Sequence, residues 1–271
     1  MKITIIRPLL SLLLVCPLVF TGAARAFEEV RGPLDSDPKL PSIPDIGDIQ
    51  LSPDEWTEVQ KGEIVVQILE RGEEDRQARA IGYLKHNPSQ LFDVATDSTL
   101  AARLVPEVKK VEVLERSSSH KRFHGEADFS FMLPRFQYTM LSAYNDSHTG
   151  QAWTQVKGDL DKNEGSHSFF WDAQRQQTLA VFTYDMALKG ILSIVPEYVV
   201  IRIASRTLPD FLRNLDNVID SVYAEDPARG TRVASEWTGL KPRLEGGQLA
   251  SRAWQGPIAV ATREAHPAGS P

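Results

Sequence analysis

Three oxygen-bearing side chains, Asp159, Asp161 and Asn163, have the spacing that opens a calcium-binding loop. Such a loop also needs a glycine at its sixth position and a glutamate at its twelfth, because the glycine allows a sharp turn and the glutamate binds the ion with two oxygens. Here Glu164 and Phe170 occupy those positions. The stretch therefore predicts a polar turn between two strands, and we expect neither a metal nor another cofactor.

Histidine and serine spacings indicate two further kinds of chemistry. His120 and His124 are four residues apart, which places two metal ligands on one face of a helix, but here they enter a predicted strand. Ser118 and Lys121 have the S-x-x-K spacing of serine acylases, yet the helix start and the accompanying motifs of that class are missing. No G-x-S-x-G, H-E-x-x-H or glycine-rich phosphate loop occurs in the chain. The sequence thus assigns no catalytic residue.

Two tyrosines in predicted strands, Tyr138 and Tyr184, could act as general acids. Buried tyrosines more often fill a core and satisfy their hydroxyl groups with hydrogen bonds. Whether the chain is an enzyme therefore stays open at this point, although no residue pattern favours catalysis.

The first 26 residues have the organisation of a secretory signal peptide. Two basic residues precede an apolar stretch at 9–20, and Ala24 and Ala26 supply the small side chains that signal peptidase requires. The apolar stretch is shorter than a membrane span of about 20 residues, and Pro17 interrupts it. We expect a secreted or periplasmic protein.

Loss of this segment would remove the only cysteine, Cys16, so the mature chain would depend on its core without disulfides. Val15 stands where a lipoprotein signal needs a small residue, and lipidation of Cys16 is not expected. The chain has 36 acidic and 30 basic residues, and three of the basic ones lie in the signal segment. An acidic surface disfavours nucleic acid as a partner. A transient contact with a membrane, the protein partners and the oligomeric state stay open.

Helix-start signals occur twice before the strand region. Residues 27–61 form a proline-rich arm and a short helix, which Ser52 and Glu55 should open with a capping box. The arm could be a PxxP ligand, but an arm packed on the domain is the simpler interpretation. Asn87 and Gln90 repeat the capping pattern, and a further short helix should run from Ser98 to the residues before the proline at 106.

Hydrophobic and polar residues alternate between positions 108 and 188, which predicts a run of antiparallel strands. The expected connections are at 117–119, 145–150, 161–165 and 172–176. Beyond Gly190 the period is helical: Pro196 should start one segment, and Thr207 should cap a second segment with a strong apolar stripe. A domain at 62–224 followed by a flexible tail at 225–271 is therefore predicted.

Three stretches carry a resemblance to a known family. They are the helix pair N-P-S-Q-L-F-D-V and L-V-P-E-V, the glycine-containing strands V-K-G-D and E-G-S, and the strand at 177–184. They resemble the START-like (SRPBCC, helix-grip) superfamily, and within it the polyketide cyclase/dehydrase or coenzyme Q-binding START domains. The resemblance implies an apolar cavity between a sheet and the terminal helix that binds a lipid, quinone, sterol or polyketide-like molecule. The family has no universal catalytic set, so no active-site residues follow from it.

The predicted fold is therefore α+β, with a curved antiparallel sheet around a long C-terminal helix. The predicted function is the binding or transport of a hydrophobic small molecule. A cyclase or hydratase, or an interaction module whose cavity is filled by side chains, are the alternatives. Aromatic and aliphatic residues that should face each other across the sheet and the helix are the predicted ligand-binding residues: Phe129, Phe131, Tyr138, Met140, Phe182, Tyr184, Phe211, Leu215, Val218 and Ile219.

We predict that export cleaves the chain after Ala26, because small side chains at 24 and 26 follow an apolar stretch of suitable length. The intact mass of the exported protein measures this directly. A mature protein that retains Met1 to Ala26, or that carries lipid on Cys16, would contradict the prediction.

Overall fold

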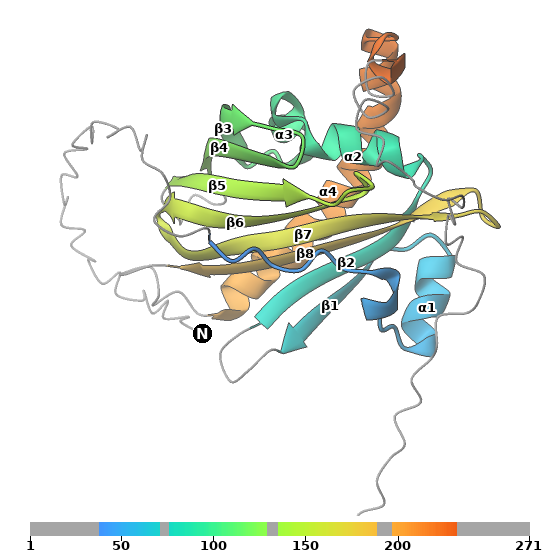
Figure 1. The fold of residues 1–271 in the computed structure, drawn as a ribbon. Coiled ribbons are helices and arrows are strands. Elements are labelled where there is room, and N and C mark those ends of the chain that lie inside the picture. The colour runs from blue at the N-terminus through green and yellow to red at the C-terminus, as the bar shows by residue number, and fades with distance from the viewer. Residues whose placement is uncertain (1–37, 71–75, 129–134, 189–196, 232–271) are drawn as a thin grey trace, which may run out of the picture. The chain divides into compact units, whose positions relative to one another are not determined.

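The computed structural model describes residues 38–70, 76–128, 135–188 and 197–231. The predicted signal peptide and most of the predicted C-terminal tail lie outside these ranges. Within them, eight antiparallel strands form one sheet, and the long helix α4 (Glu197–Glu225) packs against it (Figure 1). This arrangement confirms the predicted α+β fold.

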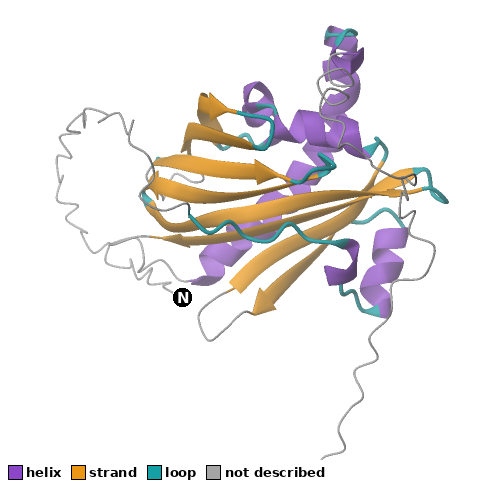
Figure 2. Cartoon of the chain, viewed as in Figure 1, coloured by secondary structure: helices purple, strands orange, loops and turns teal. Residues whose placement is uncertain are grey.

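The sheet has the strand order β1-β2-β8-β7-β6-β5-β4-β3. Strands β3 to β8 follow one another as a meander, while the β1–β2 hairpin joins β8 and so extends the sheet beyond the last strand (Figure 2). The bounds are β1 Val65–Glu70, β2 Arg76–Leu84, β3 Val108–Arg116, β4 His120–Ala127, β5 Phe136–Tyr144, β6 Gly150–Gly158, β7 Leu160–Asp172 and β8 Gln177–Leu188.

The short helices begin at the predicted capping residues. Helix α1 (Pro53–Gln60) has a capping box in which Ser52 N donates to Glu55 Oε2 at 2.7 Å. Helix α2 (Pro88–Thr96) has the equivalent box, with Gln90 N donating to Asn87 Oδ1 at 3.0 Å. The turn η2 (Ser98–Leu100) and helix α3 (Ala101–Leu104) follow and lead to the edge strand β3. These caps satisfy backbone N–H groups that a helix start leaves free, which confirms the predicted starts.

One face of the sheet, called here the helix face, is covered by α2, α3 and α4. Buried residues of α4 such as Leu212, Leu215 and Ile219 form a core with α2 and with residues of β2 and β8. The predicted division of the last helix into two capped segments is wrong, because Thr207 and Pro209 lie inside one continuous helix. A proline removes one backbone hydrogen bond, but the apolar stripe continues across it and packing keeps the helix intact.

Polar contacts fasten α4 to the elements around it. His86 contacts Asp216 at 2.9 Å and Asp220 at 3.0 Å from its two ring nitrogens. Arg229, which follows α4 and lies beyond the predicted domain end at 224, pairs with Asp93 and, at 2.7 Å, with Asp97. These contacts fix the position of α2 and of the turn after it relative to α4.

The opposite face of the sheet is covered by α1 and by the arm that precedes it, which runs across the strands in Figure 1. Ser168 Oγ donates to the carbonyl of Pro44 at 2.8 Å, and Gln67 Nε2 donates to the carbonyl of Gln50 at 2.8 Å. Ile49 joins a second core cluster on this face. The described part of the proline-rich arm thus packs on the domain.

One predicted loop is absent. Residues 161–165 belong to β7, which begins at Leu160, so that the turn between β6 and β7 is limited to Asp159. The polar run was mistaken for a loop because Lys162 and Glu164 point to one face of the strand while Asn163 and Gly165 point to the other. This strand carries central residues of the site.

We expect Leu215→Ala to lower the free energy of unfolding by about 2 to 5 kcal/mol, because it empties space in a close-packed core. Leu215 is 0% exposed. Asn217→Ala, at an exposed position of the same helix, should change it by less than about 0.5 kcal/mol. Urea unfolding of the two variants checks this, and equal stability of both would show that Leu215 does not close the core.

Candidate functional site

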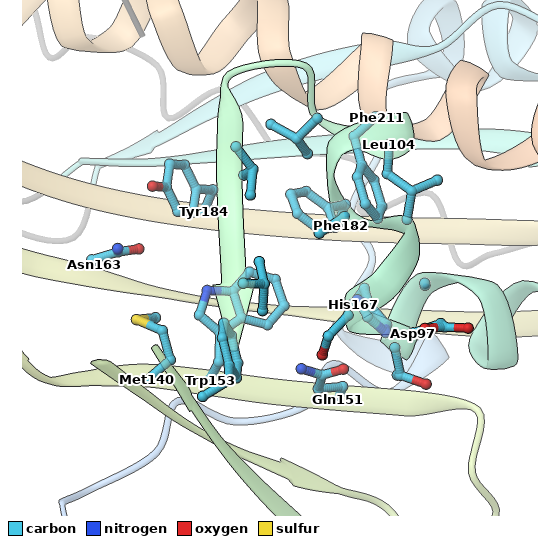
Figure 3. Close-up of a pocket in the computed structure, with 18 of the residues that line it drawn as sticks. Asp97, Leu104, Met140, Gln151, Trp153, Asn163, His167, Phe182, Tyr184 and Phe211 are labelled. Carbon is cyan, nitrogen blue, oxygen red and sulfur yellow. The ribbon is translucent and has the colours of Figure 1, made fainter. Parts of the chain in front are cut away.

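A cavity of about 200 Å³ lies between the helix face of the sheet and helices α2, α3 and α4 (Figure 3). Strands β3 to β8 all contribute side chains to its wall, and the described side chains of α4, which begin at residue 205, contribute Thr207, Leu208 and Phe211. Most of the lining is apolar, as is typical of sites for small molecules. The cavity therefore occupies the place between sheet and terminal helix that the resemblance implied.

The predicted ligand-binding residues divide into three groups. Tyr138, Met140, Phe182, Tyr184 and Phe211 line the cavity. Phe129 and Phe131 lie outside the described residues. Leu215, Val218 and Ile219 do not line the cavity and pack in the core beyond its end. In the described part of the α4 stripe, Leu208 and Phe211 line the cavity, whereas Leu215, Val218 and Ile219 meet other side chains.

Aromatic rings form one wall of the cavity. The ring centroids of Trp153 and Phe182 are 5.4 Å apart with planes inclined by 37°, and Phe182 stacks on Phe211 at 4.5 Å. Leu104 of α3 lies near this stack in Figure 3. Such rings offer a large apolar surface of fixed orientation, which suits a hydrophobic and preferably flat ligand.

Two glycines allow aromatic side chains to lie flat against neighbouring strands. A Cβ on Gly165 would stand 2.5 Å from Trp153 Cζ2, and a Cβ on Gly125 would stand 2.5 Å from the ring of Tyr138. Each glycine is the cross-strand partner of the aromatic residue that covers it. The missing side chains therefore set the depth of the cavity on the sheet side.

The cavity has a polar end near the turn between α2 and η2. Lys121 Nζ donates to the carbonyl of Thr96 at 2.7 Å and to Ser98 Oγ at 3.0 Å, and lies 5.1 Å from the ring centroid of Phe123. Burial, aided by the positive charge of Arg116, lowers the pKa of Lys121 to about 8 although Asp97 opposes this shift. The ammonium group is thus tied to backbone and hydroxyl oxygens at the rim.

His167 and Gln151 lie at the same end and are cross-strand partners on β7 and β6. His167 is 2% exposed, and neither of its ring nitrogens has a hydrogen-bond partner among the described residues. Gln151 is 6% exposed, and its Oε1 is equally without a partner in the described part of the chain. Burial, with the nearby charge of Lys121, lowers the pKa of His167 to about 3, so its ring is neutral at pH 7.

The other end of the cavity holds Asn163, Tyr184 and Met140, as Figure 3 shows. Burial raises the pKa of the Tyr138 hydroxyl to about 12, and burial together with the charge of Asp185 and the neighbouring Tyr138 raises that of Tyr184 further. Both hydroxyl groups therefore stay protonated at neutral pH. They can donate hydrogen bonds but release protons poorly.

The spacings that suggested other chemistry have structural explanations. Asp159 Oδ2 accepts a hydrogen bond from Gln137 N at 2.8 Å and so closes the turn after β6. His120 contacts Ser117 Oγ at 2.7 Å in the β3–β4 turn, while His124 lies within β4. The described ranges contain no group of three His, Cys, Asp or Glu side chains placed to hold a metal ion.

Most of the lining residues were not among those predicted, and Lys121, Gln151, Trp153 and His167 are four of them. Three of these four are polar, and polar residues in a sequence usually indicate a solvent-facing position of a strand or a loop. A signal was available for His167, because Asn163, Gly165, His167 and Phe169 alternate once β7 is recognised as a strand.

None of the helices in the described residues combines the length and the apolar character that crossing a membrane requires.

Because His167 is buried in its neutral form, the stability of the protein should depend on pH through this residue. The unfolded chain binds a proton with a pKa of about 6.5 and the folded chain only near 3, so between these values the unfolded state holds more protons. The contribution of neutral His167 to the free energy of unfolding is fully present above about pH 6.5 and is lost as the pH falls. Between pH 7 and pH 5 the free energy of unfolding should drop by about 2 kcal/mol through this residue.

Urea unfolding of the wild type and of His167→Phe at both pH values measures this difference. The other histidines contribute equally to both proteins, so the wild type should lose more stability on acidification than the variant. Equal losses would show that His167 is accessible to protons in the folded state.

Comparison with solved structures finds the same fold at low sequence identity. Human STARD10 matches with a TM-score of 0.51 and 9% identity over 74% of this chain and 91% of that one. Two further matches have lower TM-scores. The Zhui aromatase/cyclase of Streptomyces sp. R1128 gives 0.47 at 16% identity, over 54% of this chain and 94% of that one. A STAR-related lipid transfer protein of Xanthomonas axonopodis gives 0.43 at 16% identity, over 55% and 98%.

No protein-family model matches the chain, and the search of curated proteins finds no match. The structural neighbours include START superfamily proteins and aromatase/cyclases. Since the likeness to human STARD10 spans most of both chains at 9% identity, it establishes the fold. The chain has the START-like helix-grip fold.

Proposed function

We propose that this protein binds and carries a hydrophobic small molecule in the cavity between the sheet and helices α2, α3 and α4. The observation that carries the proposal is the cavity itself, about 200 Å³ in volume, with the neighbouring rings of Trp153, Phe182 and Phe211 in its wall. Proteins of this fold usually bind hydrophobic ligands, which supports the same conclusion.

Burial of apolar surface can supply the affinity. Each buried methylene contributes about 0.8 kcal/mol, so that five carbons give roughly 4 kcal/mol before the costs of ordering the ligand are subtracted. A lipid or an isoprenoid quinone would place only part of its length in a cavity of about 200 Å³. A compact ring system would fit as a whole.

An enzyme of the cyclase or hydratase type is the second candidate, because His167 and Tyr184 line the cavity. General acid–base catalysis is most effective when the pKa of the catalytic group lies near the working pH. The pKa of His167 is near 3 and that of Tyr184 is raised above its ordinary value. One is therefore a weak base and the other a weak acid, and the same groups are better suited to donating and accepting hydrogen bonds.

Organic extraction of the purified protein, followed by mass spectrometry, tests the binding function and identifies the ligand in the same measurement. A hydrophobic compound that is enriched with the wild type supports the proposal. The same extraction from a variant with a filled cavity is the control for compounds that adhere to the protein surface.

Ala101 and Ala102 offer a matched pair for this purpose, because Ala101 lines the cavity and Ala102 is exposed on the same short helix. Ala101→Phe should fill ligand space and lower the affinity for the uncharged probe N-phenyl-1-naphthylamine by about tenfold or more, since a lost contact of about 1.4 kcal/mol is a factor of ten. Stability should change little because empty space accepts the added ring.

Ala102→Phe should bind the probe as the wild type does. Fluorescence titration measures both affinities, and thermal unfolding confirms that both variants fold. Equal binding by the wild type and both variants would place the probe outside the cavity, and absence of binding to the wild type would remove the basis of the proposed function.

A further inference from the structure

The polar end of the cavity is unusual in its hydrogen bonding. Half-buried side chains with one buried, unbonded oxygen, such as Gln67 and Gln155, form hydrogen bonds through their amide nitrogen. His167 forms no hydrogen bond through either ring nitrogen within the described structure, although its side chain is only 2% exposed. An unsatisfied buried polar group costs about 1 to 3 kcal/mol. Two such groups, His167 and Gln151, side by side on one wall indicate a ligand that completes them.

The charged groups near this end have hydrogen-bond partners within the protein. Asp97 lines the cavity and pairs with Arg229 at 2.7 Å. Burial would raise the pKa of Asp97, but hydrogen bonds from Thr99 and Arg229 outweigh it and lower the pKa. Lys121 uses two of its three N–H donors on the carbonyl of Thr96 and the hydroxyl of Ser98. The groups that lack partners are uncharged, which favours an uncharged ligand.

The unsatisfied atoms define the complementary group. A neutral imidazole offers one N–H donor and one acceptor nitrogen, and Gln151 Oε1 is an acceptor. Because the two residues are directly opposite on neighbouring strands, their Cβ atoms are about 4.5 to 5.5 Å apart and one ligand atom can reach both side chains. A hydroxyl group can accept from the imidazole and donate to the amide oxygen. A carboxylate has no proton to donate and would face Oε1 with negative charge.

The space beside these groups selects the rest of the molecule. His167 lies nearly parallel to Phe182, with planes inclined by 16° and centroids 6.2 Å apart, and Trp153 is 5.8 Å from His167. A flat aromatic ring fits walls of this kind. An engineered cavity of about 150 Å³ in another protein holds benzene, so about 200 Å³ suits one or two fused rings.

We propose that the cavity selects an uncharged aromatic ligand that bears a hydroxyl group, with His167 and Gln151 as the residues that recognise the hydroxyl. This inference rests on the proposed binding function and adds the chemical class of the ligand. His167 and Gln151 determine specificity, while the aromatic rings and Leu104 provide the apolar contacts.

The test uses three ligands of one ring system: 2-naphthol, its near-isostere 2-methylnaphthalene, and the anion 2-naphthoate. Calorimetric titration at pH 7 should show that the wild type binds 2-naphthol at least about tenfold more tightly than either of the others, because a site built to hydrogen-bond a hydroxyl discriminates against its absence. His167→Phe and Gln151→Leu should each reduce this preference while binding of 2-methylnaphthalene is retained or improved.

His167→Phe provides a second readout. Phenylalanine has a similar shape and no unsatisfied nitrogens, so the ligand-free variant should melt at or above the temperature of the wild type at pH 7. Loss of hydroxyl preference together with unchanged or increased stability identifies a recognition residue. A marked loss of stability with unchanged preference would instead assign His167 a structural role and overturn the inference.

The outcomes separate the two proposals. Equal affinity for 2-naphthol and 2-methylnaphthalene would overturn hydroxyl recognition but leave hydrophobic binding intact. Tighter binding of 2-naphthoate than of 2-naphthol would overturn hydroxyl recognition and would instead indicate that Lys121 holds an anion. Failure to bind any of the three, together with failure to bind N-phenyl-1-naphthylamine, would contradict both proposals.

Discussion

The structure depends on the fact that one helix cannot cover an eight-stranded sheet. Strands lie about 4.8 Å apart, so this sheet is about 34 Å wide, whereas a helix with its side chains is about 10 Å across. The contacts of α4 with the sheet fall mainly on β1, β2 and β8. The remaining strands, on the β3 side, are covered by α2 and α3, which are short. The cavity is the space that α2, α3 and α4 leave unfilled over these strands.

This division explains why one apolar stripe on α4 has two roles. Leu212, Leu215 and Ile219 meet β2, β8 and α2 and are fully buried, so they hold the helix in place. Leu208, one turn before Leu212, and Phe211, one turn before Leu215, line the cavity. The residues from Leu212 onward therefore anchor the helix, while Leu208 and Phe211 form part of the cavity wall. The ion pairs of Arg229 reinforce the anchored end and hold α2 at the mouth of the cavity.

Local signals were sufficient to predict the frame of this structure from the sequence. The capping boxes at Ser52 and Asn87 depend on neighbouring residues alone, and the alternation of the strands follows from burial of one face. The site was only partly predictable, because a stripe on a helix does not reveal which of its residues meet a core and which meet a space. The stretch at 161–165 was misassigned because both faces of β7 are polar there: Asn163 lines the cavity, and Lys162 and Glu164 lie on the other face, so the strand has the composition of a loop.

The fold does not decide the ligand, and the reason lies in how a sheet is built. Backbone hydrogen bonds and alternation fix where the side chains of β6 and β7 point, but not their chemistry. Apolar residues at 151 and 167 would fit the same positions and avoid the cost of unsatisfied polar atoms. That the chain has Gln151 and His167 there instead is a departure from what stability favours, as is common at functional sites. The polarity of these two residues, rather than the shape of the fold, is the part of this protein that carries information about what it binds.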